Sequence, residues 1–235
     1  MSELAALLFD CDGVLVDTER DGHRPAFNEA FRRSGVAAEW SVELYGELLS
    51  TAGGKERMRR YFDDVGWPVP DTGRAELIAK LHRLKTDLFM EMIEAGALDL
   101  RPGVARLIDE AQAAGVAVAV CSTSNERAVT TIVRVLLGPD RAAGISIFAG
   151  DMVAHKKPAP DVYLMAANTL ESPSANCVVV EDSHIGLAAA RAAGMRCIVT
   201  RSAYSGDEDF TGADKVVDNL DEGIDLKFCR ALVQG

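Results

Sequence analysis

The stretch LLFDCDGVLVDTE, residues 7–19, decides the fold. Its apolar start is typical of a strand buried on both faces, and the strand gives way to Asp10 and Asp12, followed by Gly13. Side chains two positions apart in an extended chain point to the same side. The two carboxylates therefore face one centre beyond the end of a buried strand, and Gly13 allows the backbone to turn away tightly.

Further apolar runs rich in Val and Ile recur along the chain, and we expect each to be a strand. Together with the first run they cover residues 4–9, 116–121, 145–149, 177–180 and 197–200, with a short edge at 216–217. Between most of them lie apolar residues at helical spacing, often followed by glycine. Alternating strands and helices predict an α/β fold with a doubly wound, Rossmann-like parallel sheet.

The alternation is interrupted once, directly after the first strand. Residues 20–94 show only helical spacing, most clearly in the stripe of Leu77, Leu81, Leu84 and Leu88. We predict an all-helical cap domain at residues 19–95, inserted into a core domain made of residues 1–18 and 96–235. Two chain crossings would join these domains and could act as a hinge.

The overall composition restricts the partners. The 235 residues include 25 Lys and Arg against 36 Asp and Glu, a net charge of −11, which argues against nucleic acid or an anionic membrane as the main partner. No stretch approaches the roughly 18 apolar residues of a membrane span. The five cysteines lack metal-binding spacing, so we expect reduced thiols. We expect a monomer that acts on a small molecule.

Polar side chains follow the predicted strands, at the edge where ligands bind in open parallel sheets. They are Asp10 and Asp12 after the first strand, Ser122 and Thr123 after the second, and Glu181 and Asp182 after the fourth, with Lys157 between the third and fourth. Four carboxylates in one small site repel one another and demand a cation. Mg²⁺ prefers such oxygen ligands and commonly bridges them to a substrate phosphate.

This donor set favours phosphoryl transfer. One aspartate can attack phosphorus to form an aspartyl phosphate, while the other protonates the leaving oxygen and later takes a proton from water. Each motif also has a plainer interpretation: an isolated Asp-x-Asp-Gly is more often a solvated turn, and Ser122 and Ser124 could cap the following helix. The motifs favour catalysis because they occur together, each at a strand end.

In this order and spacing, the motifs resemble those of the haloacid dehalogenase superfamily, specifically its phosphatases with a helical cap. The resemblance implies that Asp10 is the nucleophile and a Mg²⁺ ligand, and that Asp12 is the general acid and base with its carbonyl on the metal. It also implies phosphoryl contacts from Ser122 and Lys157, and metal ligation by Asp182 and Glu181. The superfamily's dehalogenases lack the second aspartate, so Asp12 argues against dehalogenation.

The segments ERDGHRPAFNEAF, LYGELLSTAGGKERM and VVVEDSHIGLAAARAAGM resemble the CbbY-type phosphatases of photosynthetic bacteria, algae and plants. That resemblance implies hydrolysis of xylulose 1,5-bisphosphate, an inhibitor of the carbon-fixing enzyme Rubisco, to xylulose 5-phosphate. It also implies a place in the chloroplast stroma, or in the cytoplasm of a bacterial source.

A bisphosphate carries a second phosphate that the core cannot hold while it processes the first. The segment GGKER offers Gly54, Lys55 and Arg57, with free backbone N–H groups at an expected helix start. Glu19, His23 and Tyr45 are candidates for contacts to sugar hydroxyls or to this phosphate.

Two alternatives stay open. A sugar phosphomutase of the β-phosphoglucomutase type would use the same fold but pass the phosphoryl group to a second sugar hydroxyl. A non-enzymatic phosphoacceptor would need an aspartate, Mg²⁺ and a lysine, but it has no use for the proton that Asp12 can donate.

Overall fold

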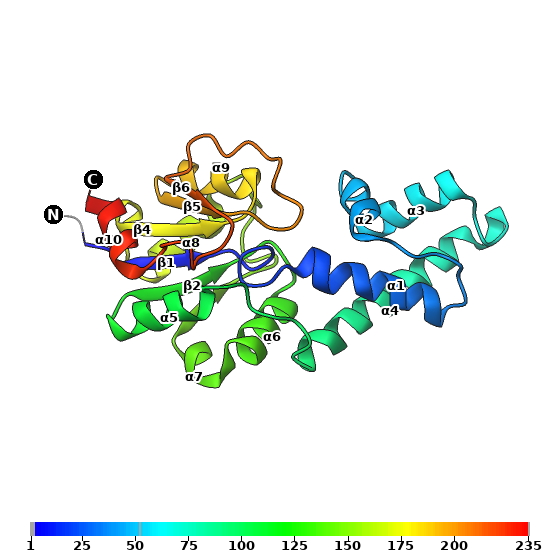
Figure 1. The fold of residues 1–235 in the computed structure, drawn as a ribbon, viewed down its shortest axis with the longest axis horizontal. Coiled ribbons are helices and arrows are strands. Elements are labelled where there is room, and N and C mark those ends of the chain that lie inside the picture. Colours follow the sequence, from blue (N-terminus) through cyan, green and yellow to red (C-terminus); the bar gives the residue numbers. More distant parts are fainter. Residues whose placement is uncertain (1–2, 52, 235) are drawn as a thin grey trace. The chain divides into compact units, whose positions relative to one another are not determined.

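The computed structural model describes residues 3–51 and 53–234 and divides into two compact units (Figure 1). The core unit comprises Met1–Asp17 and Leu98–Gly235, and the cap unit comprises Thr18–Ala97. The sequence pattern assigned residues 18, 96 and 97 to the core instead. The N–H groups of Gly96 and Ala97 each donate to carbonyls of the preceding helix at 3.0 Å, so these residues finish a helix of the cap.

The core unit is built on one parallel sheet, as the sequence predicts. Its strands are β1 (Ala6–Phe9), β2 (Ala117–Cys121), β3 (Ile145–Phe148), β4 (Cys177–Glu181), β5 (Arg196–Thr200) and β6 (Lys215–Val217). Their order is β3-β2-β1-β4-β5-β6, and every neighbouring pair is parallel. β1 lies at the centre, between β2 and β4. The strands that carry the motifs are therefore neighbours in the sheet.

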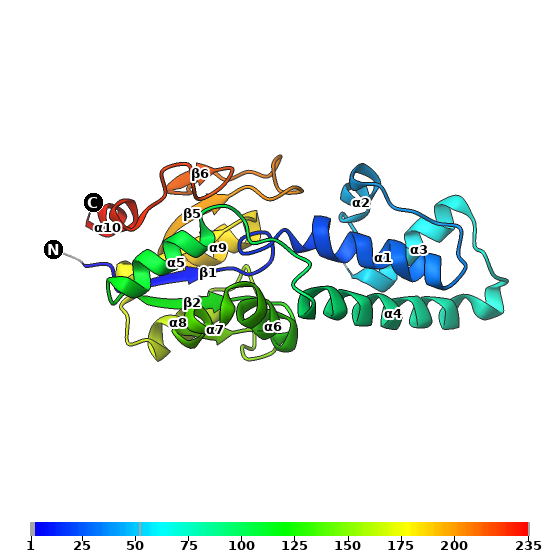
Figure 2. The same cartoon turned by 60° about the horizontal axis from the view of Figure 1, so that its bottom comes forward.

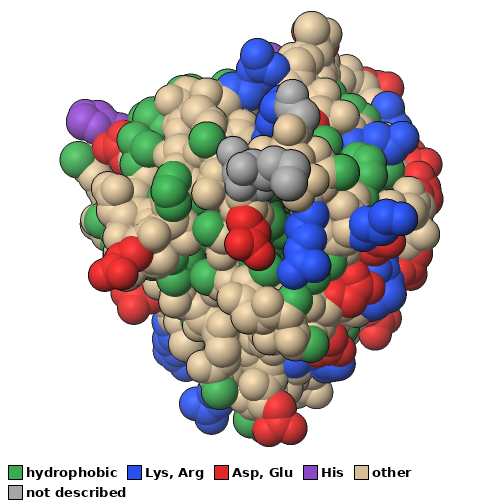
Figure 3. All heavy atoms as spheres, turned by 90° about the vertical axis from the view of Figure 1, so that its left-hand side faces the viewer, with side chains coloured by type: hydrophobic (Ala, Val, Ile, Leu, Met, Phe, Trp, Pro, Cys, Tyr) green, Lys and Arg blue, Asp and Glu red, His purple; other side chains and the backbone are tan. Residues whose placement is uncertain are grey.

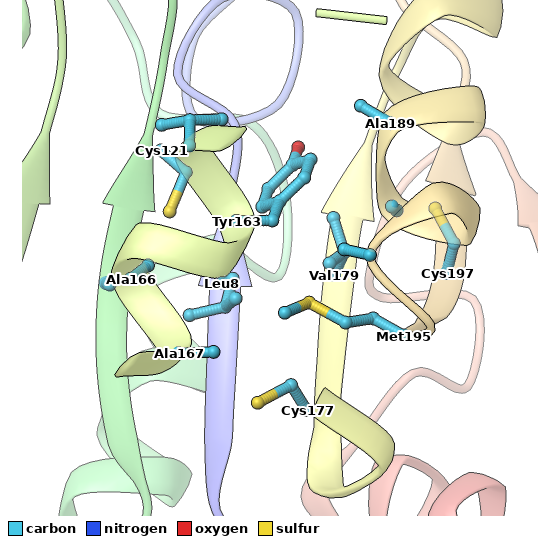
Figure 4. Packing of buried hydrophobic residues seen from close by; sticks show 14 of the residues in the cluster. Leu8, Cys121, Tyr163, Ala166, Ala167, Cys177, Val179, Ala189, Met195 and Cys197 are labelled. Carbon is cyan, nitrogen blue, oxygen red and sulfur yellow. The ribbon is translucent and has the colours of Figure 1, made fainter. Parts of the chain in front are cut away.

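Helices cover the sheet of the core unit (Figures 1 and 2). They are α5 (Val104–Ala113), α6 (Glu126–Leu136), α7 (Gly138–Ala143), α8 (Asp161–Thr169), the 3₁₀ turn η3 (Ser174–Asn176), α9 (His184–Ala192) and α10 (Leu226–Gln234). α8 and α9 pack on one face, where their small residues such as Ala166 and Ala189 meet Leu8 and Val179 of the strands (Figure 4). α5 and α10 pack against β2, β4 and each other. Both faces are covered, which explains the continuous apolar runs.

All the regular secondary structure in the described residues of the cap unit is helical. It consists of the π-helical segment η1 (Thr18–His23), α1 (Arg24–Arg33), α2 (Val42–Leu48), α3 (Gly54–Val65), the 3₁₀ turn η2 (Asp71–Gly73) and α4 (Arg74–Glu94). Aromatic rings form its centre, with Phe27 and Phe31 at 4.7 and 5.0 Å from the ring of Trp40. The buried stripe of α4 is Ile78, Leu81, Lys85, Leu88, Phe89 and Ile93, so the predicted stripe holds at Leu81 and Leu88 only.

Three features of the molecule bear on the expectations from composition. All five cysteines are buried free thiols. Among the described helices, none combines the length and apolar character needed to cross a membrane. On the face shown in Figure 3, acidic and basic side chains are interspersed and form no continuous basic surface.

Candidate active site

Three neighbouring strands deliver the candidate catalytic side chains to one edge of the sheet. Phe9 of β1 pairs with Val120 of β2 and Val180 of β4. Asp10 and Ser122 follow these strands directly, and Glu181 is the last residue of β4. Parallel pairing in this register places Asp10 level with Glu181, and Ser122 one residue further along the same edge.

Lys157 joins these strands through its side chain. Its Nζ donates to Asp10 Oδ1, to Glu181 Oε1 at 2.6 Å and to the carbonyl of Cys121 at 3.0 Å. The lysine side chain is only 4% exposed. Burial acts to lower the pKa of Lys157, but the charges of Asp10 and Glu181 outweigh burial and raise it above its ordinary value. The ammonium group is therefore a permanent positive charge between two carboxylates.

Tyr163 of α8 supports this arrangement, and its hydroxyl points toward the carboxyl ends of the strands (Figure 4). The hydroxyl donates to Glu181 Oε1 at 2.6 Å, and Lys157 Nζ lies 4.8 Å from the centre of the ring. Burial acts to raise the pKa of Glu181, but Lys157, together with hydrogen bonds from the Tyr163 hydroxyl and the Asp182 N–H, outweighs burial and holds the pKa below its ordinary value. Glu181 is thus a buried, ionised group with fixed orientation. Tyr163 was not predicted, because its helical, apolar surroundings in the sequence give no signal of this role.

Asp10, Glu181 and Asp182 bring their carboxylates together. One oxygen from each lies within 4.8 Å of the others. Burial raises the pKa of Asp10 to about 8, opposed by Lys157 and reinforced by Glu181 and Asp12. Burial also raises the pKa of Asp182 well above its ordinary value, with the charges of Glu181 and Asp10 adding to the effect. An all-oxygen cluster in which two of three carboxyl groups, Asp10 and Asp182, resist ionisation is a donor set that suits a hard divalent cation.

Two glycines make room for the cluster. A Cβ on Gly13 would lie 1.9 Å from Asp182 Oδ2, and a Cβ on Gly186 would lie 1.9 Å from the carboxylate carbon of Glu181. Gly13 also has a φ of 77°, a conformation that other residues adopt at a cost. The sequence predicts the turn at Gly13. The close approach of Asp182 is a second reason for glycine at that position, and only the fold reveals it.

Asp12 lies beside the loop that follows β2. Ser124 Oγ donates to Asp12 Oδ2 at 2.5 Å, and the Ser124 N–H donates to Ser122 Oγ at 3.0 Å. The predicted capping role of Ser124 is wrong, because Asn125 caps α6 by accepting from the N–H groups of Arg127 and Ala128. Ser124 contacts the carboxylate instead. Thr123 contributes its carbonyl to Lys156 Nζ at 3.4 Å.

Arg101 holds the loop that carries the two aspartates. Its guanidinium donates to the carbonyls of Gly13, Thr200 (3.2 Å), Arg201 (2.5 Å) and Asp218 (2.7 Å), and its N–H donates to the Leu15 carbonyl at 2.8 Å. The loop after β1 is therefore fastened to the ends of β5 and β6. No sequence signal pointed to this role, because the five carbonyls come from distant segments.

In the cap unit, three of the predicted substrate-binding residues form one hydrogen-bonded chain. Arg57 Nη1 donates to the Tyr45 hydroxyl at 2.7 Å, and that hydroxyl donates to Glu19 Oε2 at 2.5 Å. Arg57 and Tyr45 are buried, and Arg57 Nη1 is 3.7 Å from Glu19 Oε2. α3, α2 and η1 thus each supply one member. The buried Nε of Arg57 has no hydrogen-bond partner among the described residues.

The other predicted cap residues lie next to basic side chains. Gly54 begins α3, and a Cβ there would lie 3.1 Å from Phe27 Cζ and 3.4 Å from His82 Cδ2. Lys55 is exposed, and its charge acts on His82. His23 is 3.0 Å, through Nδ1, from Nζ of the buried Lys85. Lys85 was not predicted, although its position in phase with the apolar stripe of α4 was a usable signal.

Comparisons with known proteins extend this description. Residues 4–194 match the family model described as haloacid dehalogenase-like hydrolase. A CBBY-like protein of Arabidopsis thaliana is 58% identical over 238 residues, which cover 98% of this chain and 75% of that protein. Protein CbbY of Cereibacter sphaeroides is 44% identical over 230 residues, or 95% of this chain and 97% of that protein.

Several solved structures are also similar to this chain. CbbY from Rhodobacter sphaeroides in complex with phosphate has a TM-score of 0.77 and 42% identity, covering 99% of this chain and all of that one. A mutant of the same protein in complex with xylulose-(1,5)bisphosphate has a TM-score of 0.76 and 42% identity over 95% and 98% of the two chains. A putative β-phosphoglucomutase from Thermotoga maritima shares the fold, with a TM-score of 0.71 and 23% identity over 91% and 94%.

Proposed function

The chain belongs to the haloacid dehalogenase-like hydrolase family and is a phosphatase, and on this premise we propose that it removes one phosphate from a sugar bisphosphate. The proposed reaction converts xylulose 1,5-bisphosphate to xylulose 5-phosphate, and so removes an inhibitor of Rubisco. The observation that carries the chemistry is the convergence of Asp10, Lys157 and Glu181 at one sheet edge. The related protein in complex with xylulose-(1,5)bisphosphate supports the choice of substrate.

The proposed reaction runs in two steps. A carboxylate oxygen of Asp10 bonds to phosphorus, the ester bond breaks, and Asp12 gives its proton to the departing sugar oxygen. Asp12, now ionised, then takes a proton from the water that attacks phosphorus, which releases inorganic phosphate and restores Asp10. Lys157 and Ser122 would hold the phosphoryl oxygens, with Thr123 as a neighbouring contact to substrate.

Asp10, Glu181 and Asp182, together with the carbonyl of Asp12, are the groups that we propose hold Mg²⁺. Their oxygen-only donor set and mutual repulsion fit this ion. When bound, Mg²⁺ would supply positive charge against the carboxylates and the entering phosphate dianion.

The cap unit would hold the second phosphate. Lys55 and Arg57 would provide the positive charge, and the backbone N–H groups at Gly54 would add donors at the start of α3. Glu19, His23 and Tyr45 would contact the sugar hydroxyls. The observation that supports this assignment most directly is the Nε atom of Arg57, which is buried and has no hydrogen-bond partner among the described residues.

We propose a monomer that works in the chloroplast stroma if the source is a plant or alga, and in the cytoplasm if it is bacterial. The 58% identity to an Arabidopsis thaliana protein supports the plant alternative. Chromatography of the purified chain with light-scattering detection tests the monomer. A fluorescent fusion of the full natural gene product tests the location.

The substrate assignment is tested by phosphate release from a panel of sugar phosphates in the presence of Mg²⁺. We expect xylulose 1,5-bisphosphate to exceed ribulose 1,5-bisphosphate and the monophosphates in kcat/KM. Rapid hydrolysis of ribulose 1,5-bisphosphate would contradict the proposal. A phosphomutase would instead produce a sugar phosphate isomer without free phosphate, and a phosphoacceptor module would be modified about once per chain without turnover.

A further inference from the structure

Lys85 is a buried cation in the middle of an apolar helix face. The residue is only 9% exposed and lies between Leu81 and Leu88 in the buried stripe of α4. An ammonium group in such a position is costly unless its protons are paired. Its surroundings therefore indicate what the charge does in the cap unit.

Two aromatic rings and one imidazole lie beside the Lys85 ammonium. Nζ lies 4.9 Å from the ring centre of Phe27 and 5.4 Å from that of Phe89. The His23 ring packs on Phe89 at 3.9 Å between centres, and its Nδ1 is 3.0 Å from Nζ. The ring faces favour the charged form of the lysine. Lys85 is thus an ammonium group held against His23.

The chemistry of the pair determines which nitrogen of His23 carries a proton. An ammonium group has donors and no acceptor, so a hydrogen bond between Nζ and Nδ1 requires Nδ1 to accept. The proton of the neutral imidazole then lies on Nε2. A second proton, on Nδ1, would point directly at the ammonium group of Lys85. The ring therefore cannot become an imidazolium without breaking the contact.

The wider electrostatics of the cap act in the same direction. Burial lowers the pKa of His23 well below its ordinary value, and the charges of Lys85 from α4 and Arg57 from α3 add to the effect. Both of these neighbours are positive. The ring therefore remains neutral under conditions in which an exposed histidine would titrate.

We propose that Lys85 is a positioning residue that fixes His23 as the neutral Nε2–H tautomer. This inference rests on the proposed function, in which His23 contacts the sugar. A neutral N–H donor suits a hydroxyl or carbonyl oxygen of the sugar chain, whereas the cations Lys55 and Arg57 suit the second phosphate. The cap would then distinguish the two parts of its ligand by charge.

The tautomer can be measured directly in the substrate-free, full-length protein. Nitrogen NMR of the histidine side chains, with His23 assigned by its loss in His23→Gln, should show an unprotonated Nδ1 and a protonated Nε2 from about pH 5 to 8. Lys85→Met should mix the tautomers and shift the His23 titration upward, toward this range. Lys85→Arg, which keeps a charged donor, should retain the wild-type pattern. The exposed Lys80 on the same helix provides the control Lys80→Met.

Steady-state kinetics with the proposed substrate provide a second test. Lys85→Met should raise the KM for xylulose 1,5-bisphosphate by about tenfold with a smaller change in kcat, as expected for loss of one oriented hydrogen bond. Combining it with His23→Gln should add little. A wild-type His23 that titrates near its ordinary pKa, or a protonated Nδ1, would overturn the inference. Failure to hydrolyse this substrate would count against the proposed function and leave the NMR result as the test of the tautomer.

Discussion

The two units bury different sets of charges. Among the described residues, the core unit buries three carboxylates, Asp10, Asp17 and Glu181, together with the side chain of Lys157, whereas the cap unit buries the cations Arg57 and Lys85. Buried carboxylates call for a cation, and buried cations call for an anion. The contrast matches a division of labour in which one unit performs phosphoryl chemistry and the other recognises an anionic ligand.

The units also differ in how they hold these groups. In the core, the end of each strand fixes a side chain, and Lys157 joins neighbouring strands. In the cap, the groups lie on separate helices and are fixed by aromatic packing and by the chain from Arg57 to Glu19. A sheet register is harder to change than a helix surface. We therefore expect substitutions in the core to affect all substrates, and those in the cap to depend on the substrate.

Asp10→Asn is the strongest test of the core. Without the nucleophile, kcat should fall on the order of 10⁴-fold or more for every substrate, as when members of other catalytic groups are removed. Asparagine can still accept from Lys157, so the fold should persist. Phosphate release and a thermal melt measure the two effects. Substantial turnover in a folded variant would remove Asp10 from its assigned role.

Asp12→Asn should cost about 10²- to 10⁴-fold in kcat on sugar phosphates, the range for loss of a general acid and base. p-Nitrophenyl phosphate has a leaving group that needs no proton, so the first step should survive on this substrate. Stopped-flow should show a burst of about one p-nitrophenol per enzyme, followed by slow turnover. Equal slowing of the burst and the steady state would contradict the role of Asp12.

Two adjacent lysines provide a matched pair. Lys157→Met should lower kcat by about 10²- to 10³-fold, because a buried donor to the reacting groups is lost. Lys156 is half exposed and pairs with Asp151 at 3.0 Å, so Lys156→Met should change kcat little. Steady-state kinetics on both variants test whether catalysis depends on Lys157 and not on Lys156. Similar losses in the two would show that general positive charge, and not the geometry of Lys157, is responsible.

Gly13→Ala tests the cation site without removing a ligand. The new Cβ would collide with Asp182 Oδ2 and displace that carboxylate. The Mg²⁺ concentration for half-maximal activity should rise by about 10- to 100-fold, the effect of disturbing groups that orient metal ligands. Gly194→Ala, at a positive-φ glycine with open space around it, controls for backbone strain. An unchanged Mg²⁺ requirement would place the ion elsewhere.

Lys55→Ala is the mildest change and the sharpest test of the cap. It should lower kcat/KM for the bisphosphate by roughly tenfold, the effect of losing one charged hydrogen bond, and affect a small monophosphate far less. The exposed Lys80 again offers a control of equal charge. Equal losses on both substrates would show that Lys55 is not an anchor for the second phosphate.

Much of the core could be predicted from residues 7–19 and the strand pattern. Apolar runs indicate the strands, and parallel strands necessarily present their carboxyl ends together, so the amino-acid sequence is enough to group Asp10, Ser122 and Glu181. Supporting contacts could not be predicted in this way. Tyr163, Ser124 and Arg101 act through hydrogen bonds to distant segments, and their neighbours in the sequence give no indication of those partners.

In the cap, the sequence by itself determined that the insert is helical and contains GGKER, because helical spacing and glycine are local signals. Only the tertiary structure decided that Lys85 meets His23, 62 positions away, between the rings of Phe27 and Phe89. The physical reason is that helix periodicity specifies which residues share a face. Periodicity does not specify the surface of another helix against which these residues will pack.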